Sequence, residues 1–278
     1  MSHPRVSVVV PAYNNEPFIR QTMSSVLEQD GVDLELIVAD HSSKDATWDA
    51  MGEFADDPRV RLLVTPAGGG AEANFNRVSA EARGDLIKLL PGDDYLLPGS
   101  LRRQVAILDE NPAAVLTAAR RRLVDARGDV VVNAYGLKGV RGPMRGAEAI
   151  RHTVRAGSNV FGEPGSVLMR RQALDAAGLW DFRFPYLVDQ ATYINLLLQG
   201  DFIPDAEPGA VFRLNNGQWS VALTDYQYQQ VSSYHRDLRQ RRPDILTEGD
   251  VRVGNRNAWL MAQRRRVTYR ILKKRMSS

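Results

Sequence analysis

The sequence predicts an α/β protein built on a doubly wound, mostly parallel sheet, with helices on both faces and a helical extension at the C-terminus. Two observations predict this class. Short apolar segments of strand length alternate with amphipathic segments of helix length up to residue 90, as in proteins that cover a parallel sheet with crossover helices. Polar or turn-forming residues follow the predicted strands at 11–15, 40–45 and 91–94. Ligands of doubly wound sheets bind beyond the carboxyl ends of the strands, so these segments form the expected binding edge.

The first predicted strand, 6–10, is a β-branched run that Pro11 ends, which is typical of a strand buried in a parallel sheet. Pro17 opens a helix in which Ile19, Met23 and Val26 recur at helical spacing, so that one face can pack on the sheet. The other elements expected in this half are a strand at 34–39, a helix through 47–54, a strand at 60–64, a helix near 71–82 and a strand at 86–90.

From about residue 115 the alternation loosens. Segments 115–124 and 130–132 flank Arg127-Gly128-Asp129 and predict a hairpin. We expect the parallel part of the sheet to end there. A strand at 166–169 and helices at 171–177, 188–199 and 224–240 complete the prediction.

The composition fits one large globular domain, since 44% of the 278 residues are hydrophobic and 25% are charged. The chain contains no cysteine, which excludes a disulfide framework and a thiolate metal site. The N-terminal apolar run is too short for a secretory signal peptide, and no segment reaches membrane-spanning length. We therefore expect a cytoplasmic protein.

The segment 84–94 carries the strongest chemical signal, because a predicted buried strand delivers the adjacent carboxylates Asp93 and Asp94 to the binding edge. Two carboxylates in such a place repel each other, and a hard divalent cation such as Mg²⁺ or Mn²⁺ relieves that repulsion. The same Pro-Gly-Asp-Asp composition is also good turn chemistry, and taken alone it favours a turn.

Four ordered segments give the sequence a specific resemblance. They are VVVPAYNN at 8–15, ELIVAD at 35–40 followed by SSKD at 42–45, NFN at 74–76, and LPGDD at 90–94 followed by PG at 98–99. Further matches are GEP at 162–164, VLMRR at 167–171, GLWD at 178–181 and the acid Asp189. With these motifs the chain resembles a family 2 glycosyltransferase of the GT-A fold, a Rossmann-like fold, from residue 5 to about 220.

The resemblance implies that a nucleoside-diphosphate sugar binds at the edge of the sheet. Pro11, Ala12 and Tyr13 would lie against the nucleobase, and Asp40 would accept hydrogen bonds from the base or the ribose. The other donor-binding residues that the resemblance implies are Asn15, Asn76, Lys88, Gly92 and Asp93.

The resemblance also implies a divalent metal at Asp93. Where the family usually has an Asp-x-Asp signature, this chain has Pro91-Gly92-Asp93, so the first acid is missing. Mg²⁺ or Mn²⁺ would then rest on one carboxylate, with the diphosphate and water completing its coordination. Asp94 is expected as a helper ligand or as an N-terminal cap for the next element of the chain. A histidine that the family often carries near the diphosphate is replaced by Asn215 or Asn216.

Asp189 stands where the family places its catalytic base, at the start of a predicted helix. That placement implies a metal-dependent hexosyltransferase that works by an inverting single displacement on a hydroxyl of a glycan, a lipid-linked sugar or a natural product, in cell-envelope or polysaccharide biosynthesis. From its sequence position alone Asp189 could equally cap the helix, and Asp181 and Glu163 are the next candidates for the base. The alternative function is a catalytically idle domain of the same fold that binds a nucleotide or a glycan.

The domain prediction is a glycosyltransferase domain at 1–222, with a donor half at 1–115 and an acceptor half at 116–222, followed by a helical, basic extension at 223–278. Within it, 255–276 predicts a basic amphipathic helix whose apolar residues are Trp259, Leu260, Val267, Ile271 and Leu272. Such a helix can lie on an anionic membrane, here the inner face of the cell membrane, or dock on the core. No nucleic-acid motif accompanies the charge, so no nucleic-acid partner is expected.

Overall fold

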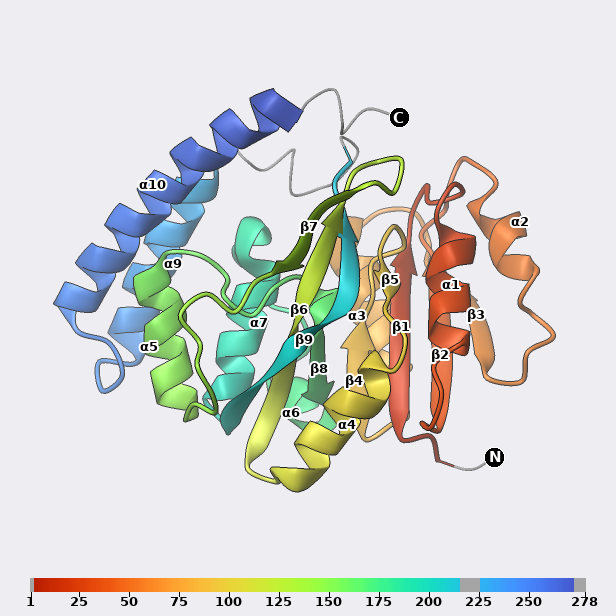
Figure 1. Ribbon diagram of the computed structural model, residues 1–278, viewed down its shortest axis with the longest axis horizontal. Helices are drawn as coiled ribbons and strands as arrows, with labels where there is room; N and C mark the ends of the chain where they lie inside the picture. The colour runs from red at the N-terminus through yellow and green to blue at the C-terminus, as the bar shows by residue number, and fades with distance from the viewer. Residues whose placement is uncertain (1–2, 216–225, 273–278) are drawn as a thin grey trace.

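The computed structural model describes residues 3–215 and 226–272, with side chains described as far as Arg266. Its centre is a 9-stranded sheet in which four parallel strands run in the order β3-β2-β1-β4 (Figure 1). These strands are β1 (Val6–Ala12), β2 (Leu34–Asp40), β3 (Val60–Val64) and β4 (Leu86–Leu89). The doubly wound, mostly parallel half of the fold is therefore confirmed.

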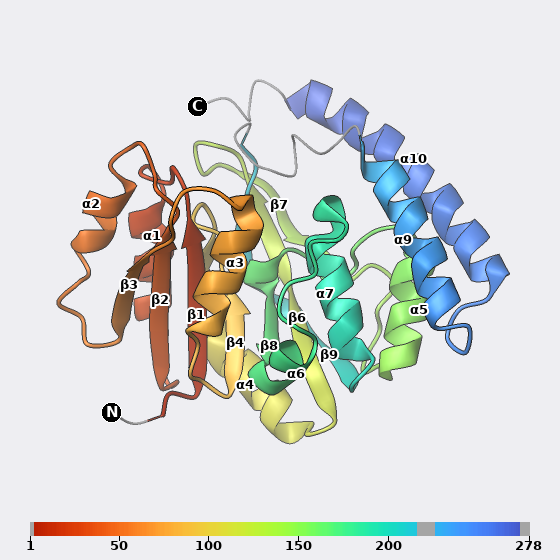
Figure 2. The same cartoon turned by 180° about the vertical axis from the view of Figure 1, so that it is seen from behind.

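Alternating side chains of these strands build two apolar cores, one on each face of the sheet. Val8 and Val10 of β1 belong to one core, and Val9 belongs to the other. The first face is covered by α1 (Ile19–Leu27), α2 (Thr47–Gly52) and α4 (Ser100–Glu110), and the second by helices that include α3 (Gly70–Ala80) (Figures 1 and 2). Each fully buried Val, Leu or Ile stabilises the fold by about 1.5–3 kcal/mol. Burial on both faces therefore fixes β1, β2 and β4 inside the molecule, and β3 is the partly buried edge strand.

The second half of the sheet mixes strand directions. β8 (Val167–Arg170) lies antiparallel between β4 and β6 (Ala114–Val124), and β7 (Val130–Tyr135) forms the expected hairpin with β6. β9 (Asp201–Arg213) then pairs with β6 in parallel, and β5 (Tyr95–Leu96) pairs with β9.

The expectation that parallel pairing ends near residue 115 is wrong, because β9 pairs in parallel with β6. Two prolines, Pro204 and Pro208, interrupt the apolar pattern of β9, and prolines within a run argue against a central strand. The register of the pair shifts around Arg120, next to Pro208, which accommodates the irregular segment.

The helices of this half cover the face seen in Figure 2 and the end of the molecule away from β3. The expected helices are present as α6 (Arg171–Ala176), α7 (Val188–Leu197) and α9 (Gln227–Arg241). α5 (Gly146–Ala156) was not predicted. Two short 3-10 turns, η1 (Pro164–Ser166) and η2 (Pro185–Leu187), precede β8 and α7.

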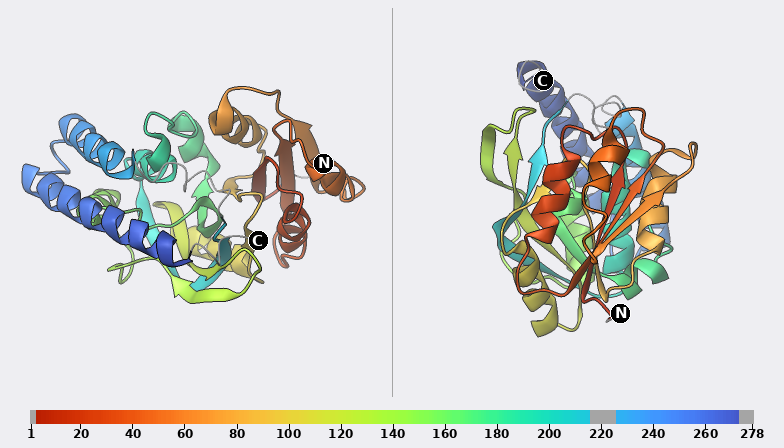
Figure 3. Two further views of the ribbon diagram at one scale, coloured as in Figure 1. Left: turned by 90° about the horizontal axis from the view of Figure 1, so that it is seen from above. Right: turned by 90° about the vertical axis from the view of Figure 1, so that its right-hand side faces the viewer.

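The C-terminal helix α10 (Glu248–Leu272) begins earlier than the predicted residue 255 and packs on α5 and α9 (Figure 3). Its close approach to α5 depends on glycine: a Cβ on Gly254 would lie 2.3 Å from the carbonyl oxygen of Val154. Asp250 is fully buried and pairs with Arg151 and Arg155 of α5. The extension is thus docked on the core along its N-terminal half. Within residues 3–215 and 226–272, no helix is long and apolar enough to cross a membrane.

Candidate active site

The carboxyl ends of β1 and β2 are joined by a network of polar contacts. Asp40 is buried, and its carboxylate accepts hydrogen bonds from the backbone N–H (3.1 Å) and the hydroxyl of Ser43. The Ser43 hydroxyl in turn accepts a hydrogen bond from the backbone N–H of Asn14 at 2.9 Å. Asp40 is therefore held at the base of the edge where the sequence predicts donor binding, with lone pairs left for a ligand, since each carboxylate oxygen can accept two hydrogen bonds.

Asn74 on α3 ties the same two strands together, a role that the sequence did not reveal. Its side-chain amide donates to the carbonyl oxygens of Ala12 (3.2 Å) and Ala39 (3.1 Å). Asn74 is itself buried, so these two bonds satisfy its own side-chain amide. The Ala12 carbonyl oxygen also accepts the backbone N–H of His41 at 2.9 Å.

Tyr13 is the exposed aromatic side chain of this edge, with 52% of its surface accessible. Its ring lies 6.1 Å from the ring of His41, which follows β2 directly. Pro11 and Ala12 are buried in β1. At the end of β1, Tyr13 is therefore the side chain with a face open to a planar ligand.

Gly92 brings the turn after β4 against the end of β1. A Cβ at Gly92 would lie 2.5 Å from Oδ1 of Asn15, a distance that real Cβ atoms essentially never show. The same Asn15 oxygen accepts the backbone N–H of Tyr13 at 2.8 Å. The absence of a side chain at Gly92 therefore lets the turn lie directly against Asn15, which sets Asp93 beside the donor edge.

Asp93 is half-buried, and its Oδ2 accepts a hydrogen bond from the side-chain amide of Asn215 at 2.8 Å. Its carbonyl oxygen accepts one from Nε of Arg213 at 3.1 Å. Arg213 ends β9, lies over the ring of Phe18 at 4.6 Å and donates to Gln21 at 2.7 Å. It connects Asp93 to α1 and was not singled out by the sequence, because these contacts join segments far apart in the chain.

Asp94 has a different environment from its neighbour. It is 2% exposed, and its carboxylate accepts the backbone N–H of Arg213 at 3.0 Å. Burial, and next the charge of Asp93, raises the pKa of Asp94 well above its usual range. Asp94 therefore joins the turn to β9, and the expected helper-ligand or capping role does not describe its contacts.

The donor set fits a divalent cation that takes most of its ligands from substrate and water. In the part of the chain that the structure describes, no group of three or more histidine or acidic side chains could hold a metal. Asp93 supplies one hard oxygen donor at the strand end. Mg²⁺ commonly uses one or two carboxylates together with substrate phosphate oxygens, so Asp93 is compatible with such a site.

Lys88 and Asn76 were expected to contact the donor, but their side chains bond to other parts of the chain. The ammonium group of Lys88 is buried and donates to the carbonyl oxygens of Gly165 (2.8 Å) and Val167 (3.0 Å), and burial lowers its pKa to about 7. Oδ1 of Asn76 accepts the backbone N–H of Trp180 at 3.1 Å. Both side chains connect the two halves of the fold.

Asp189 lies in the first turn of α7 and is half-buried. The helix begins after Leu187 without a side-chain cap, and no described residue donates a hydrogen bond to the Asp189 carboxylate. Burial raises the pKa of Asp189 to about 7, with the charge of Glu163 adding to the rise and Arg121 opposing it. A carboxyl group with such a pKa can accept and release a proton near neutral pH, which is the property required of a general base.

The two other candidate bases, Asp181 and Glu163, are bound to cationic or amide side chains. Asp181 accepts hydrogen bonds from Arg183 (2.7 Å) and Asn195 (3.1 Å). Burial acts to raise its pKa, but the bonds to Arg183 and Asn195 outweigh burial and hold the pKa below its usual value. Glu163 forms an ion pair with Arg121. Asp189 is thus the acid of this group with the fewest partners among the described residues.

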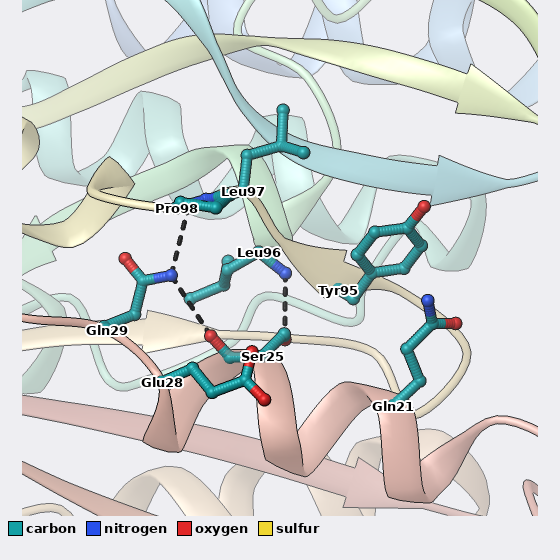
Figure 4. Close-up of a pocket in the computed structure, with 8 residues that line it drawn as sticks. All are labelled: Gln21, Ser25, Glu28, Gln29, Tyr95, Leu96, Leu97 and Pro98. Atoms are coloured by element: carbon teal, nitrogen blue, oxygen red, sulfur yellow. Dashed lines mark hydrogen bonds between the residues drawn. The ribbon is translucent and has the colours of Figure 1, made fainter.

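A hollow of about 300 Å³ lies between α1 and the segment 95–98 (Figure 4). Its polar groups bond to one another: Gln29 donates to the carbonyl oxygens of Ser25 and Leu97, and the Ser25 hydroxyl accepts the N–H of Leu96. None of the predicted site residues lines it. It is therefore not part of the predicted site.

Known proteins resemble this chain in sequence and in fold. A protein of Mycobacterium tuberculosis with no characterised function is 34% identical over 211 residues, covering 72% of this chain and 65% of that protein. The chondroitin synthase of Pasteurella multocida is 35% identical over 135 residues, covering 48% of this chain and 14% of the synthase. The chain thus spans less than two thirds of each relative.

Among solved structures, S. aureus TarS in complex with UDP-GlcNAc aligns with a TM-score of 0.67 at 16% identity, over 84% of this chain and 66% of that chain. The mannosyltransferase PcManGT from Pyrobaculum calidifontis, in complex with GDP-Man and Mn²⁺, aligns with a TM-score of 0.62 at 16% identity, over 94% of this chain and 70% of that one. These likenesses confirm the GT-A fold. The family model described as glycosyl transferase family 2 matches residues 7–178, and the chain belongs to that family.

Proposed function

We propose that the protein is an inverting glycosyltransferase that moves a hexose from a nucleoside-diphosphate sugar to a hydroxyl of a glycan, a lipid-linked sugar or a natural product. The observation that carries this proposal is Asp189, a half-buried carboxyl group with a pKa near 7 and no hydrogen-bond donor among the described residues. The complexes of the similar structures support a nucleotide-sugar donor. The similarity to a chondroitin synthase supports polysaccharide assembly as the process.

The donor half, residues 1–115, would bind the nucleotide along the ends of β1, β2 and β4. Tyr13 offers its exposed face to the base, and the fixed carboxylate of Asp40 accepts hydrogen bonds from base or ribose. Asn15 bonds to the backbone of Tyr13, and the turn at Gly92 packs closely against Asn15, which fixes the geometry of this edge. Mg²⁺ or Mn²⁺ held by Asp93 would neutralise charge on the leaving diphosphate.

The acceptor half, residues 116–222, would bring a hydroxyl to Asp189. Glu163 lies between the two halves, because its negative charge raises the pKa of both Asp94 and Asp189. Its loop also packs beside the segment that leads from β4 to Asp93, since a Cβ on Gly165 would lie 3.0 Å from Leu90. Asp189 takes the proton of the acceptor hydroxyl as its oxygen attacks the sugar carbon and the diphosphate leaves. A single displacement of this kind inverts the configuration of that carbon.

The direct test is a panel of nucleotide sugars, each assayed with and without Mn²⁺ or Mg²⁺ for release of nucleoside diphosphate. We expect slow hydrolysis of one donor even without an acceptor, and faster release when metal is present. Tight nucleotide binding without release from any donor, with glycan and lipid-linked acceptors supplied, would instead support the idle binding domain.

We also propose that α10 touches the anionic inner face of the cell membrane. Arg252, Arg256, Trp259 and Arg266 are exposed and recur at helical spacing on the side away from α5. Leu260 is 39% exposed beside them. Arginine side chains attract anionic lipid, and an exposed tryptophan suits the interfacial region. Val267, Ile271 and Leu272, also predicted to contribute, lie outside the described side chains.

Vesicle sedimentation tests this surface. Changing Arg252, Arg256 and Arg266 together to Gln should weaken binding to anionic vesicles by about tenfold or more, at about 1 kcal/mol per arginine near the surface. The control changes Arg77, Arg127 and Arg141, which are exposed elsewhere, to Gln. Equal loss in both triple variants would mean that net charge alone acts, and the α10 surface would be discarded.

A further inference from the structure

Arg121 is a buried cation in the middle of β6 whose position is tightly fixed. It is 5% exposed and forms an ion pair with Glu163. Its guanidinium lies 4.8 Å from the centre of the Tyr135 ring. A Cβ at Gly136 or Gly162 would lie 2.6 or 2.8 Å from its Nη1, so the chain leaves room for this group by placing glycine on two sides of it.

Glu163 is equally fixed, because the turn that follows it is bound from the donor half. Lys88 donates to the carbonyl oxygens of Gly165 and Val167, and Gln104 on α4 donates to that of Ser166 at 2.9 Å. Three successive carbonyl oxygens are thus held by buried side chains. This explains why Lys88 is a buried lysine on β4, and it makes the Arg121–Glu163 pair a rigid part of the site.

The charges that face Asp189 come from a small set of groups. Glu163 and Arg121 act on it from the loop and from β6. The loop lies against α7, because the ring of Phe161, two residues before Glu163, packs edge to face on the buried ring of Tyr193 at 6.0 Å. Tyr193 lies one turn after Asp189 on α7. Charged side chains of the neighbouring helices are engaged away from it: Arg151 and Arg155 with Asp250, His152 with the carbonyl of Lys138, and Arg171 with Asp175. In the preceding loop Arg183 pairs with Asp181.

We propose that Arg121 and Glu163 are positioning residues for Asp189: they hold two opposite charges beside its carboxyl group and so set the pH above which it can accept the acceptor's proton. This inference rests on the proposed function. Removing the negative charge of Glu163 leaves Arg121 to favour the ionised carboxylate. Removing the positive charge of Arg121 leaves Glu163 to oppose it. The two changes therefore act on Asp189 in opposite directions.

The test is the pH dependence of kcat/KM for Glu163→Gln, Arg121→Met and the charge-conserving Arg121→Lys. In wild type the rate should rise with pH as Asp189 ionises. Glu163→Gln should move that rise to lower pH and Arg121→Met to higher pH, each by about one unit, the lower end of the effect of a neighbouring charge. Arg121→Lys should return the profile toward wild type. A purely structural ion pair would lower the rate in both variants without moving the profiles apart.

Two controls separate the possible failures. Affinity for nucleoside diphosphate should stay within about twofold of wild type in all three variants, since the pair does not line the donor edge. If wild type transfers sugar and Asp189→Asn does not, but the profiles of Glu163→Gln and Arg121→Met coincide, this inference is overturned while the proposed function stands. If Arg121→Met does not fold, Glu163→Gln decides alone: a rise at the wild-type pH or above overturns the inference. If wild type shows no transfer from any donor, the proposed function itself fails.

Discussion

At the scale of single residues, three acids near the site differ in what their surroundings do to them. Asp94 is bonded to the backbone of β9, and Asp181 is held by Arg183. Asp189 has neither kind of partner among the described residues, although it sits in a partly buried place beside the charge of Glu163. A partly buried carboxylate without a hydrogen-bond donor lowers the stability of the fold. Carboxyl groups with such perturbed pKa values are common at functional sites.

This cost gives a prediction for Asp189→Asn. The pKa of Asp189 is about 7 in the folded chain, above the unfolded value of 3.8. As pH rises from about 4 to 7 the unfolded chain loses the proton first, so stability falls and remains lower above that range. Asn removes the effect. Calorimetry should therefore show a Tm higher by roughly 5 °C at about pH 8 and little change near pH 4.

Asp181→Asn is the matched control, with the opposite sign. Its pKa is held down in the folded state, so its ionised form stabilises the fold and the substitution should lower Tm at about pH 8. A lower Tm for Asp189→Asn at the same pH would show that Asp189 stabilises the helix start instead.

A second residue-scale prediction concerns Asp40. Asp40→Ala should weaken the binding of nucleoside diphosphate by roughly 1.5–3 kcal/mol, the contribution of a hydrogen bond to a charged group, and leave the fold intact. Titration calorimetry measures the affinity, and Asp49→Ala on the exposed side of α2 is the control. Unchanged affinity for every nucleotide tested would mean that Asp40 does not bind the donor and only stabilises the turn through Ser43.

At the scale of elements, local pattern was enough for the first half of the fold. β1, β2 and β4 are buried on both faces, and their apolar runs are plain in the sequence. The edge strand β3 is only partly buried, but its run of apolar residues was also enough to predict it. β9 could not be predicted, because Pro204 and Pro208 break its pattern and only its pairing with β6 makes it a strand. α5 carries a signal that could have been used: Ala149, Ile150, Thr153 and Val154 recur as one buried face.

Local sequence likewise predicted only some residues of the candidate site. Asp40, Asp93 and Asp189 came from motifs, and the structure places them at strand ends or a helix start as expected. Asn74, Arg213 and Arg121 act through partners that are distant in sequence, so no local spacing could indicate them. Lys88 was misleading for the same reason, since a lysine in a strand gives no sign of which side of the sheet its amino group meets.

The crossing of α10 with α5 gives the element-scale prediction. Gly254→Ala would place a Cβ 2.3 Å from the carbonyl of Val154, so the helices must move apart, at a cost of about 1–3 kcal/mol. Gly249→Ala in the same helix meets only Thr247 at 3.6 Å, and should stabilise by about 0.5–1 kcal/mol through helix propensity. Denaturant unfolding measures both. Equal stability of the two variants would mean that this helix crossing adapts freely.

At the scale of the whole molecule, the C-terminal extension reaches the acceptor side of the site. Gln230 on α9 accepts the backbone N–H of Tyr186 at 2.8 Å, and Arg265 on α10 contacts the Tyr186 hydroxyl. Tyr186 lies in the turn that leads directly into Asp189. The donor side is instead held by the sheet, through Asn15, Gly92 and Arg213. Asp93 and Asp189 are thus supported by different parts of the molecule, so substitutions at the two positions should impair different steps.

The separate roles of the two acids are tested by comparing Asp93→Ala with Asp189→Asn, measuring donor binding with and without Mn²⁺ and the rate of sugar transfer. Asp93→Ala should lose the metal-dependent part of donor binding, and transfer with it. Asp189→Asn keeps its shape but cannot take a proton at neutral pH, so donor and metal affinity should persist while transfer falls by about 10²–10⁴-fold. Transfer at the wild-type rate in Asp189→Asn, or loss of donor binding in that variant, would contradict the account.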